Sequence, residues 1–350
     1  MTTYWILFAL PTFFHLTQSR LNPAIDRIAW IAVAAIFIFI LGFRHEVGCD
    51  WYGYYSTYEA WRLIPFSELL AINRISRGPA WFALLWISGQ TNMGFYGFNL
   101  MCATFFCWAI FSFCRAQPLP WLSCLIAVPY LFVVVSMGYV RQGIAIGFLV
   151  IALMQIEQQR PWRYSALILA GSLFHISLMA FSPLMLIYLY KKHRPTFILT
   201  LIVITGFGLY IARTNAGILD VYFNWETSRY LSTGAIPRVL MNSLPAGILL
   251  LMHYRHSPVI THPVWSVVTW TSVLSLLAIP LASTGFDRIV LYLLPVQLYA
   301  WSRIPGIFAS PLSKSITTLF IIGTYASYQY IWLNFSDHSS CWVPYINIFY

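Results

Sequence analysis

Long apolar runs separated by short polar segments are the feature that most limits how this 350-residue chain can fold. Several runs approach the roughly 20 residues that a helix needs to cross a bilayer, among them residues 28–43 and 313–333. Hydrophobic residues make up 59% of the chain and charged residues only 9%, against about 45–50% and about 25% in soluble domains. A soluble fold could not bury that much apolar surface, so the expected solvent is a bilayer.

The pattern predicts an all-α, polytopic integral membrane protein with a single domain over residues 1–350. Roughly 10 to 13 transmembrane helices are expected, including short or re-entrant segments. The predicted spans lie near residues 4–17, 27–43, 78–90, 92–114, 120–137, 139–156, 163–190, 196–212, 239–253, 264–282, 286–302 and 312–333. Two polar segments, 44–77 and 213–238, are longer than turns require and are the expected places for chemistry.

The formal charge of +10 follows the membrane topology and does not indicate nucleic-acid binding, because the basic residues cluster beside apolar runs. Lysine and arginine favour cytoplasmic loops, which predicts that residues 191–194 and 253–262 face the cytoplasm. By the same count, segments 44–77 and 213–238 and the C-terminal segment 334–350 lie on the external face.

Residues 155–163 also look cytoplasmic, although a single apolar stretch separates them from the basic cluster at 191–194. Either residues 157–163 are external, or residues 164–190 form two short helices that turn around near residues 174–177. We favour the turn, since His175 and Ser177 would be unfavourable in the middle of a span that faces lipid.

Two of the six cysteines, Cys49 and Cys341, lie in polar segments and could form a disulfide. The other four, inside or beside apolar runs, are expected to be buried thiols.

The first long polar segment opens directly after a predicted span and carries a row of aromatic residues. Helical spacing is shared by Trp51, Tyr54, Tyr55, Tyr58 and Arg62. This spacing predicts an amphipathic helix in the periplasmic interface, with Asp50 as its N-cap.

A functional interpretation of the same segment stands beside the structural one. Arg44, Glu46 and Asp50 would crowd the membrane surface, where the arginine binds an anion and the carboxylates do acid–base work. Tyr54 and Tyr55 could stack on sugars, although an interfacial aromatic belt explains them equally well.

Arg141 and its neighbour Gln142 stand at the head of an apolar span. An arginine there is a functional candidate, and its planar guanidinium suits phosphate oxygens. The alternative is that Arg141 snorkels to a lipid head group. Arg288, with Asp287 as a local ion-pair partner, invites the same interpretation, whereas Arg229 lies in a polar loop and is a weaker candidate.

His175, alone in an apolar run, is by itself more often a packed core residue than a catalyst. A catalytic role becomes more credible if it shares a face with Arg141.

Several common chemistries lack their sequence signatures. The chain has no Walker A motif, no Rossmann glycine fingerprint, no H-E-x-x-H and no external D-x-D pair. We therefore expect a reaction that needs neither a nucleotide nor a metal, and no cofactor.

An ordered set of short motifs resembles the EpsG branch of the Wzy-type polysaccharide polymerases over most of the chain. The motifs are Arg44-x-x-x-Gly48-x-Asp50 with the tyrosines that follow, Arg77-Gly78-Pro79, Val140-Arg141-Gln142-x-x-Ala145, Phe174-His175-Ile176-Ser177 and, more loosely, Trp342-Val343-Pro344-Tyr345.

This resemblance implies a nucleotide-independent membrane glycosyltransferase with its active face on the periplasmic side of the bacterial inner membrane. Such polymerases make O-antigen, capsule or exopolysaccharide by moving a glycan from undecaprenyl pyrophosphate onto the sugar of another lipid-linked repeat unit. A chain-length regulator is a candidate partner.

The resemblance and the residues together suggest roles at the site. Arg141 and Arg288 would hold the donor pyrophosphate with help from Arg44, and Asp50 or His175 would be the general base. The remaining candidates are Glu46 for catalysis and Gln142, Arg229, Tyr54 and Tyr55 for substrate binding.

Two other classes of function stay open. A flippase or transporter of lipid-linked oligosaccharide would also need arginines, but should show inverted repeats and charges near the midplane. A membrane O-acyltransferase of glycans would depend on His175 and would yield acylated sugar, not a longer chain.

Overall fold

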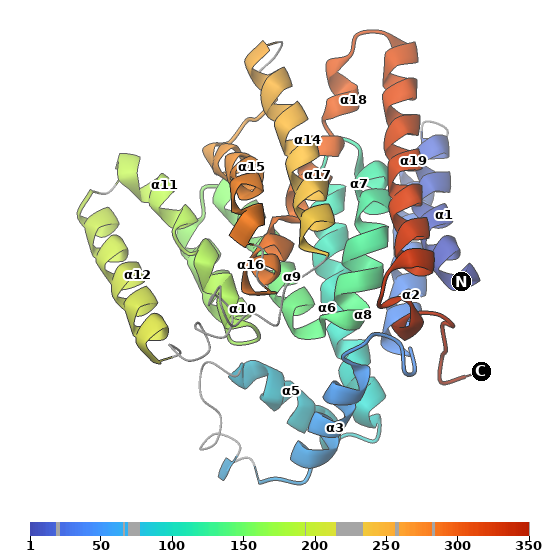
Figure 1. The fold of residues 1–350 in the computed structure, drawn as a ribbon, viewed down its shortest axis with the longest axis vertical. Helices are drawn as coiled ribbons and strands as arrows, with labels where there is room; N and C mark the ends of the chain where they lie inside the picture. The colour runs from blue at the N-terminus through green and yellow to red at the C-terminus, as the bar shows by residue number, and fades with distance from the viewer. Residues whose placement is uncertain are drawn as a thin grey trace. The chain divides into compact units, whose positions relative to one another are not determined.

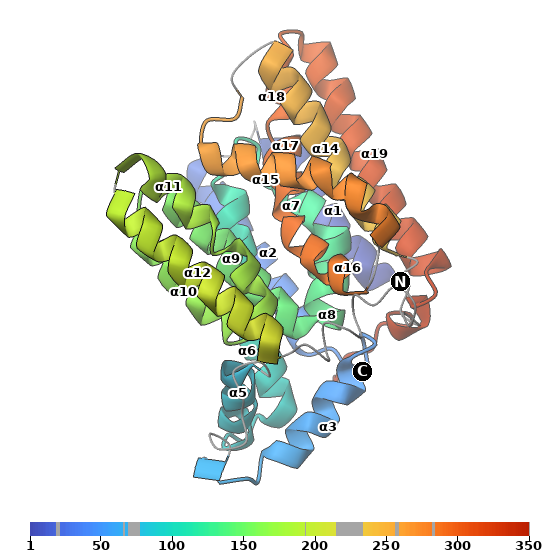
Figure 2. The same ribbon diagram turned by 60° about the vertical axis from the view of Figure 1, so that its left-hand side comes forward.

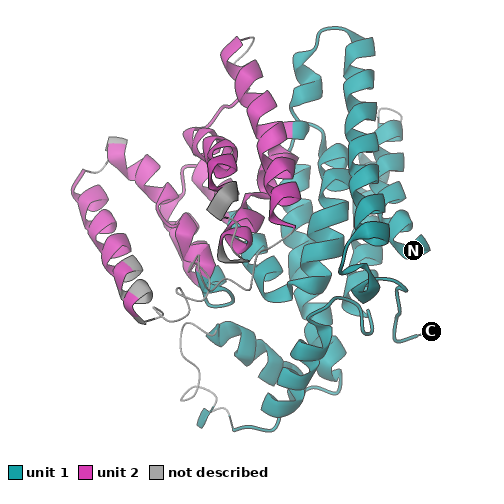
Figure 3. Ribbon diagram, in the orientation of Figure 1, with its two compact units in different colours: residues 1–151, 170–176, 301–350 teal, residues 152–169, 177–300 magenta. Residues whose placement is uncertain are grey.

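The computed structural model shows a helical protein and describes residues 1–18, 22–65, 67–68, 78–192, 194–214, 234–255, 259–281 and 284–349 (Figure 1). The chain divides into two compact units (Figure 3). Unit 1 comprises residues 1–151, 170–176 and 301–350, and unit 2 comprises residues 152–169 and 177–300. The chain passes from one unit to the other four times, inside α9 (Val140–Glu157), α10 (Pro161–Ser172), a 3-10 helix (Ile176–Phe181) and α17 (Pro295–Trp301). The expected single membrane domain stays a prediction.

Unit 1 is built from helices at both ends of the chain. Its elements are α1 (Thr2–Thr17), α2 (Pro23–Gly42), α3 (Trp51–Trp61), α5 (Pro79–Gly89), α6 (Gly94–Arg115), α7 (Pro120–Ala127), a π-helix (Val128–Val135), α8 (Ser136–Gly138), the first part of α9 (Val140–Glu157), α18 (Ile304–Ile307), α19 (Pro311–Phe335) and a 3-10 turn (Ser339–Cys341). Proline stands in the first turn of α2, α5, α7 and α19, where its missing N–H has no partner to lose.

Unit 2 takes the middle of the chain. Its elements are α10 (Pro161–Ser172) as far as Leu169, a 3-10 helix (Ile176–Phe181), α11 (Leu184–Lys192), α12 (Arg194–Thr214), α14 (Ala235–Arg255), α15 (Pro263–Leu274), a 3-10 helix (Ser275–Leu281), α16 (Thr284–Val290), a 3-10 turn (Leu291–Leu293) and α17 (Pro295–Trp301). Helix α11 runs beside α12, and α14 beside α15 (Figure 1, Figure 2).

Five helical segments of the described chain are long and apolar enough to cross a membrane, which indicates a membrane-embedded protein. They are Pro23–Gly42, Gly94–Arg115, Pro120–Gly138, Val140–Glu157 and Ala235–Arg255. Shorter apolar helices occupy most of the other predicted spans. The total of 10 to 13 transmembrane helices stays a prediction.

The centre of unit 1 is the segment that runs from α7 through the π-helix to α8. Residues 121–138 are all buried, and helices α1, α6 and α19 pack against the segment. Trp121 stacks on Trp30 at a ring distance of 3.8 Å, and Phe132 lies edge-on to Phe37 at 4.8 Å. This core ends at Gly138, three residues before Arg141 in the first turn of α9, so Arg141 lies at the end of the core.

The ambiguous stretch at residues 164–190 is a hairpin. The hydroxyl of Tyr164 donates to the carbonyl of Phe181 at 2.5 Å, and the hydroxyl of Ser165 donates to the sulfur of Met185. These contacts join the two arms on either side of a turn at residues 173–175. The favoured turn is therefore confirmed.

Both ends of this hairpin lie at one end of unit 2. One cavity is lined by residues 159–163, before and at the start of α10, and by residues at the end of α11 and the start of α12. The indole of Trp265, in the first turn of α15, donates to Glu157, the last residue of α9, at 2.5 Å. Residues 160, 192 and 262 thus share this end, which excludes a single crossing between residues 163 and 191.

We predict that tags inserted after Gln159 and after His193 are both reached only from the cytoplasm. A tag after Asp337, in the exposed C-terminal segment, serves as the external control. Protease protection in oriented membrane vesicles gives the measurement. Tags at 159 and 193 on opposite sides would contradict the hairpin.

Candidate functional site

The polar segment after α2 is fastened to the C-terminal tail. Cys49 forms a disulfide with Cys341, with a Cα–Cα distance of 5.0 Å, as the two polar cysteines allowed. Backbone hydrogen bonds add to it: His45 N–H donates to the Ile346 carbonyl at 2.9 Å, and Gly48 N–H to the Cys341 carbonyl at 2.7 Å. Residues 43–49 and 341–348 therefore lie on the same side of the membrane.

Arg44 is buried in this loop, with 1% of its surface exposed. Its guanidinium donates to the carbonyls of Leu41 at 2.5 Å, Val47 at 3.2 Å and Met137 at 3.4 Å. Burial lowers the pKa of Arg44 to about 10, which leaves it charged at neutral pH. These contacts order the loop against the end of the core, whereas assistance in pyrophosphate binding stays a prediction.

The aromatic helix predicted after Asp50 is α3, which begins at Trp51. Trp51 and Tyr58 are buried, while Tyr52 and Tyr55 are 59% and 40% exposed. Asp50 occupies the N-cap position, but its side chain makes no cap hydrogen bond. Instead it accepts a hydrogen bond from the hydroxyl of Tyr54 at 3.3 Å. A helix over these residues is confirmed, its place in the periplasmic interface stays a prediction, and the capping role of the Asp50 side chain is not observed.

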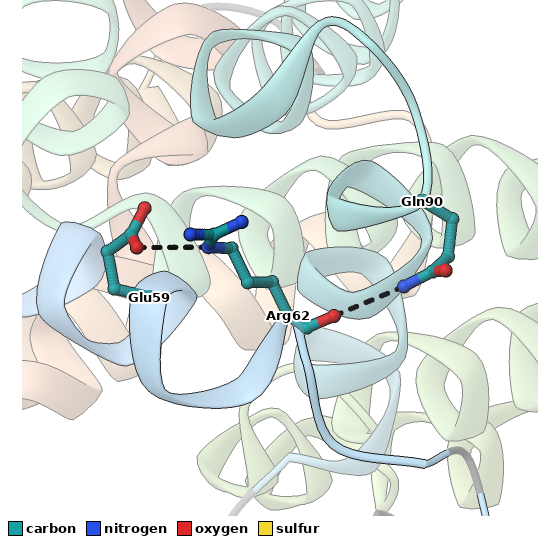
Figure 4. A network of polar contacts seen from close by, with 3 residues as sticks. All are labelled: Glu59, Arg62 and Gln90. Carbon is teal, nitrogen blue, oxygen red and sulfur yellow. Dashed lines mark hydrogen bonds and ion pairs between the residues drawn. The ribbon is translucent and has the colours of Figure 1, made fainter.

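The C-terminal end of α3 is tied to the end of α5 (Figure 4). Arg62 pairs with Glu59 one turn earlier at 2.9 Å, and the side chain of Gln90 donates to the Arg62 carbonyl at 3.2 Å. Figure 4 shows the Arg62 side chain directed at Glu59 while its backbone faces Gln90. With the disulfide beside its start, α3 is held at both ends over α5.

A polar cavity of about 250 Å³ lies between these elements. Its lining residues are Cys49, Asp50, Gly53, Tyr54, Thr57, Trp81, Phe82 and Arg141. The guanidinium carbon of Arg141 lies 5.9 Å from the centre of the Trp81 ring, within the range of a cation–π contact. One cavity thus brings together Asp50 and Tyr54, from the start of α3, and Arg141, from the start of α9. We call it the Arg141 cavity.

The turn of the hairpin reaches this neighbourhood through Gly78. The N–H of Ala80 donates to the Leu173 carbonyl at 3.1 Å. A Cβ atom at Gly78 would lie 2.7 Å from the Phe174 carbonyl oxygen and 2.9 Å from an Arg141 nitrogen. His175 is therefore one residue away from a backbone group that lies near Arg141, and its catalytic role stays a prediction.

Other predicted residues of unit 1 lie around the Arg141 cavity without lining it. Glu46 is exposed, 3.7 Å from His45, and its hydrogen bond to Tyr52 raises the pKa of that hydroxyl. Gln142 is buried, with 3% of its surface exposed. Tyr55 stacks on Trp51 at 5.3 Å.

Arg288 belongs to unit 2 and is exposed in α16. Its neighbour Asp287 is buried and binds Arg238 through both carboxylate oxygens, a pairing that the sequence did not predict. The side chain of Asn242 accepts a hydrogen bond from the side chain of Gln297 at 2.6 Å and donates one to the backbone carbonyl of Val290.

Sequence reasoning missed Trp81 and Thr57 of the Arg141 cavity and the buried cation of unit 2. Trp81 is hidden in an apolar run, but Arg238, at the start of a predicted span, carried the same signal as Arg141. Arg77 and Arg229 lie outside the described residues. Among those residues, no group of three or more His, Cys, Asp and Glu side chains could hold a metal ion.

Together these features define a polytopic membrane protein whose polar cavity is organised around an arginine at the head of an apolar helix. The sequence model of the EpsG family matches residues 27–347, nearly the whole chain, and the protein belongs to that family. The resemblance seen in the ordered motifs is confirmed. Family membership suggests a polysaccharide polymerase-type function, that of a membrane glycosyltransferase. No curated protein and no solved structure matches the chain significantly.

We predict that Gly78→Ala lowers the free energy of unfolding by about 1–3 kcal/mol. The measurement is a lower unfolding temperature of the detergent-solubilised protein. Gly78 has a φ of +81°, which favours glycine, and its Cβ would collide with Phe174 and Arg141. Gly53→Ala is the matched control, because a Cβ there meets no atom within 4 Å. Equal unfolding temperatures for the two variants would contradict the close approach at Gly78.

Proposed function

We propose that this protein is a polysaccharide polymerase that transfers a glycan from an undecaprenyl pyrophosphate carrier to a sugar hydroxyl of another lipid-linked repeat unit. The reaction would take place at the outer face of a bacterial inner membrane. One observation carries the proposal: in a chain of the EpsG family, a carboxylate, a tyrosine hydroxyl and a guanidinium line a single cavity.

Arg141 is the proposed ligand of the pyrophosphate. A guanidinium stays charged and presents several N–H donors in a plane, which matches phosphate oxygens. The Trp81 ring beside it limits the directions the guanidinium can take. The cavity, at about 250 Å³, falls just below the range of about 300–1,000 Å³ for drug-sized ligands. It therefore suits one pyrophosphate or one sugar ring, with the rest of each substrate outside.

Asp50 is the preferred general base, because its carboxylate lines the same cavity as Arg141. Burial and the neighbouring Asp50 carboxylate raise the pKa of Tyr54, so its hydroxyl stays protonated and donates to Asp50. In the transfer, the acceptor oxygen bonds to the anomeric carbon of the donor and the bond from that carbon to the pyrophosphate breaks. The hydroxyl proton passes to the base, and the charge of the leaving group is stabilised by Arg141.

Other residues have supporting roles in the proposal. Arg288 supplies a second cation for the donor, and Arg44 acts through the loop that carries Asp50. His175 is the second candidate for the base. The further candidates for catalysis or substrate contacts are Glu46, Gln142, Tyr55 and Arg229.

The disulfide supports an external location of the Arg141 cavity. Structural disulfides form and persist in oxidising compartments such as the bacterial periplasm. Cys49, one half of the bond, itself lines the cavity. The positive-inside bias of the basic segments in unit 2 independently predicts that the loop after α2 faces outward.

We predict that Arg141→Gln slows polymerisation about 100-fold or more, because a charge developing in the transition state loses its stabilising donor. The assay incubates purified protein with pyrophosphate-linked repeat units, without nucleotide, and follows the ladder of products on a gel. The polymerisation rate of Arg141→Lys should fall between those of the wild-type protein and Arg141→Gln, since lysine keeps the charge but lacks the planar guanidinium.

Arg27→Gln is the matched control, because Arg27 is an exposed arginine near the start of α2 and its loss should leave the ladder unchanged. A wild-type ladder from Arg141→Gln would overturn the role of Arg141. Movement of the lipid-linked sugar across vesicles by wild-type protein, without any ladder, would instead identify a transporter.

We predict that Asp50→Asn slows the same reaction about 100-fold or more, within the range of general base catalysis, and that His175→Ala slows it less. Because the Asp50 side chain makes no cap hydrogen bond, the unfolding temperature should change little. If His175→Ala slowed the reaction more than Asp50→Asn, with both variants folded, the general base would be His175.

A further inference from the structure

A second cavity, of about 540 Å³, lies in unit 2 and contains no residue assigned to catalysis. Helices α10, α11 and α12 surround it at the end that carries the basic segments. Its lining residues are Gln159, Arg160, Pro161, Trp162, Arg163, Tyr188, Leu189 and Thr196. We call it the Arg160 cavity.

The lining of the Arg160 cavity is cationic. Arg160 and Arg163 are both exposed, and no carboxylate in the described part of the chain forms an ion pair with either. The acidic residue closest in sequence, Glu157, accepts a hydrogen bond from the indole of Trp265. Arg194 is exposed at the start of α12 and follows two lysines in the sequence. An anion in the cavity would therefore meet several positive charges.

The surroundings of the cavity match the level of lipid head groups. Trp162 and Tyr188 line the cavity, Trp162 is 68% exposed, and both residue types favour the membrane interface. Farther along α12, Ile198, Leu199 and Ile202 are more than half exposed on an apolar helix. A ligand with a phosphate and long hydrocarbon chains would find a partner for each part.

We propose that the Arg160 cavity binds the phosphate head group of an anionic phospholipid from the cytoplasmic leaflet. Two guanidinium groups would hold the phosphate, and the two aromatic side chains would flank the glycerol. Basic pockets between transmembrane helices on the cytoplasmic side are suited to such head groups, which supply a counter-charge to Arg160 and Arg163. The proposal does not depend on the polymerase assignment.

Native mass spectrometry of the full-length protein in a neutral detergent tests the proposal. The probes are dioleoyl phosphatidylglycerol and dioleoyl phosphatidylcholine, titrated separately. Wild-type protein should bind the anionic lipid at least tenfold more tightly. Arg160→Gln and Arg163→Gln should each weaken that binding about fivefold, whereas Arg27→Gln, an exposed arginine of unit 1, should not change it.

Several results would overturn the proposal. Equal binding of the two lipids by wild-type protein would do so without any variant, and so would unchanged phosphatidylglycerol binding in a folded Arg160→Gln/Arg163→Gln protein. An equal loss in Arg27→Gln would show attraction by overall charge. Displacement of the lipid by inorganic phosphate at a comparable concentration would identify a soluble phosphate as the ligand.

Discussion

Hydrocarbon offers no partner for a polar group, and this constraint organises the protein. The backbone satisfies it by helix formation, and several buried polar side chains satisfy it by binding one another or backbone carbonyls. Arg44 binds three carbonyls, Arg238 binds both oxygens of Asp287, and Gln329 donates to the carbonyl of Tyr4 at 3.0 Å. Charges are therefore kept at helix ends, where they meet water or each other.

The Arg141 cavity follows from the same constraint. The buried segment 121–138 occupies the centre of unit 1 and ends where α9 begins, so Arg141 emerges at the end of the core. The loop with Asp50 is brought to that end by Arg44 and by the disulfide to the C-terminal tail. The hydrogen bonds of Arg44 thus help to position Asp50, whose carboxylate lines the same cavity as Arg141.

The helices could be predicted well from the sequence because apolar run length in a bilayer directly sets span length. The predicted span at 120–137 is observed as Pro120–Gly138, and the one at 139–156 as Val140–Glu157. The turn near His175 could also be predicted, because a basic segment on each side of one apolar run requires it. The partner of Asp287 could not, since Arg238 lies 49 residues away whereas Arg288 is the next residue in the chain.

The sequence by itself determined that the chain is a membrane-embedded helical protein of the EpsG family, because these properties depend on composition and on local motif order. Only the tertiary structure decided which arginine shares a cavity with Asp50 and which one holds a loop. Arg44 and Arg141 carry the same charge next to similar apolar runs. The difference between them arises from burial: the carbonyls of residues 41, 47 and 137 surround Arg44, whereas Arg141 lines an open cavity beside Trp81.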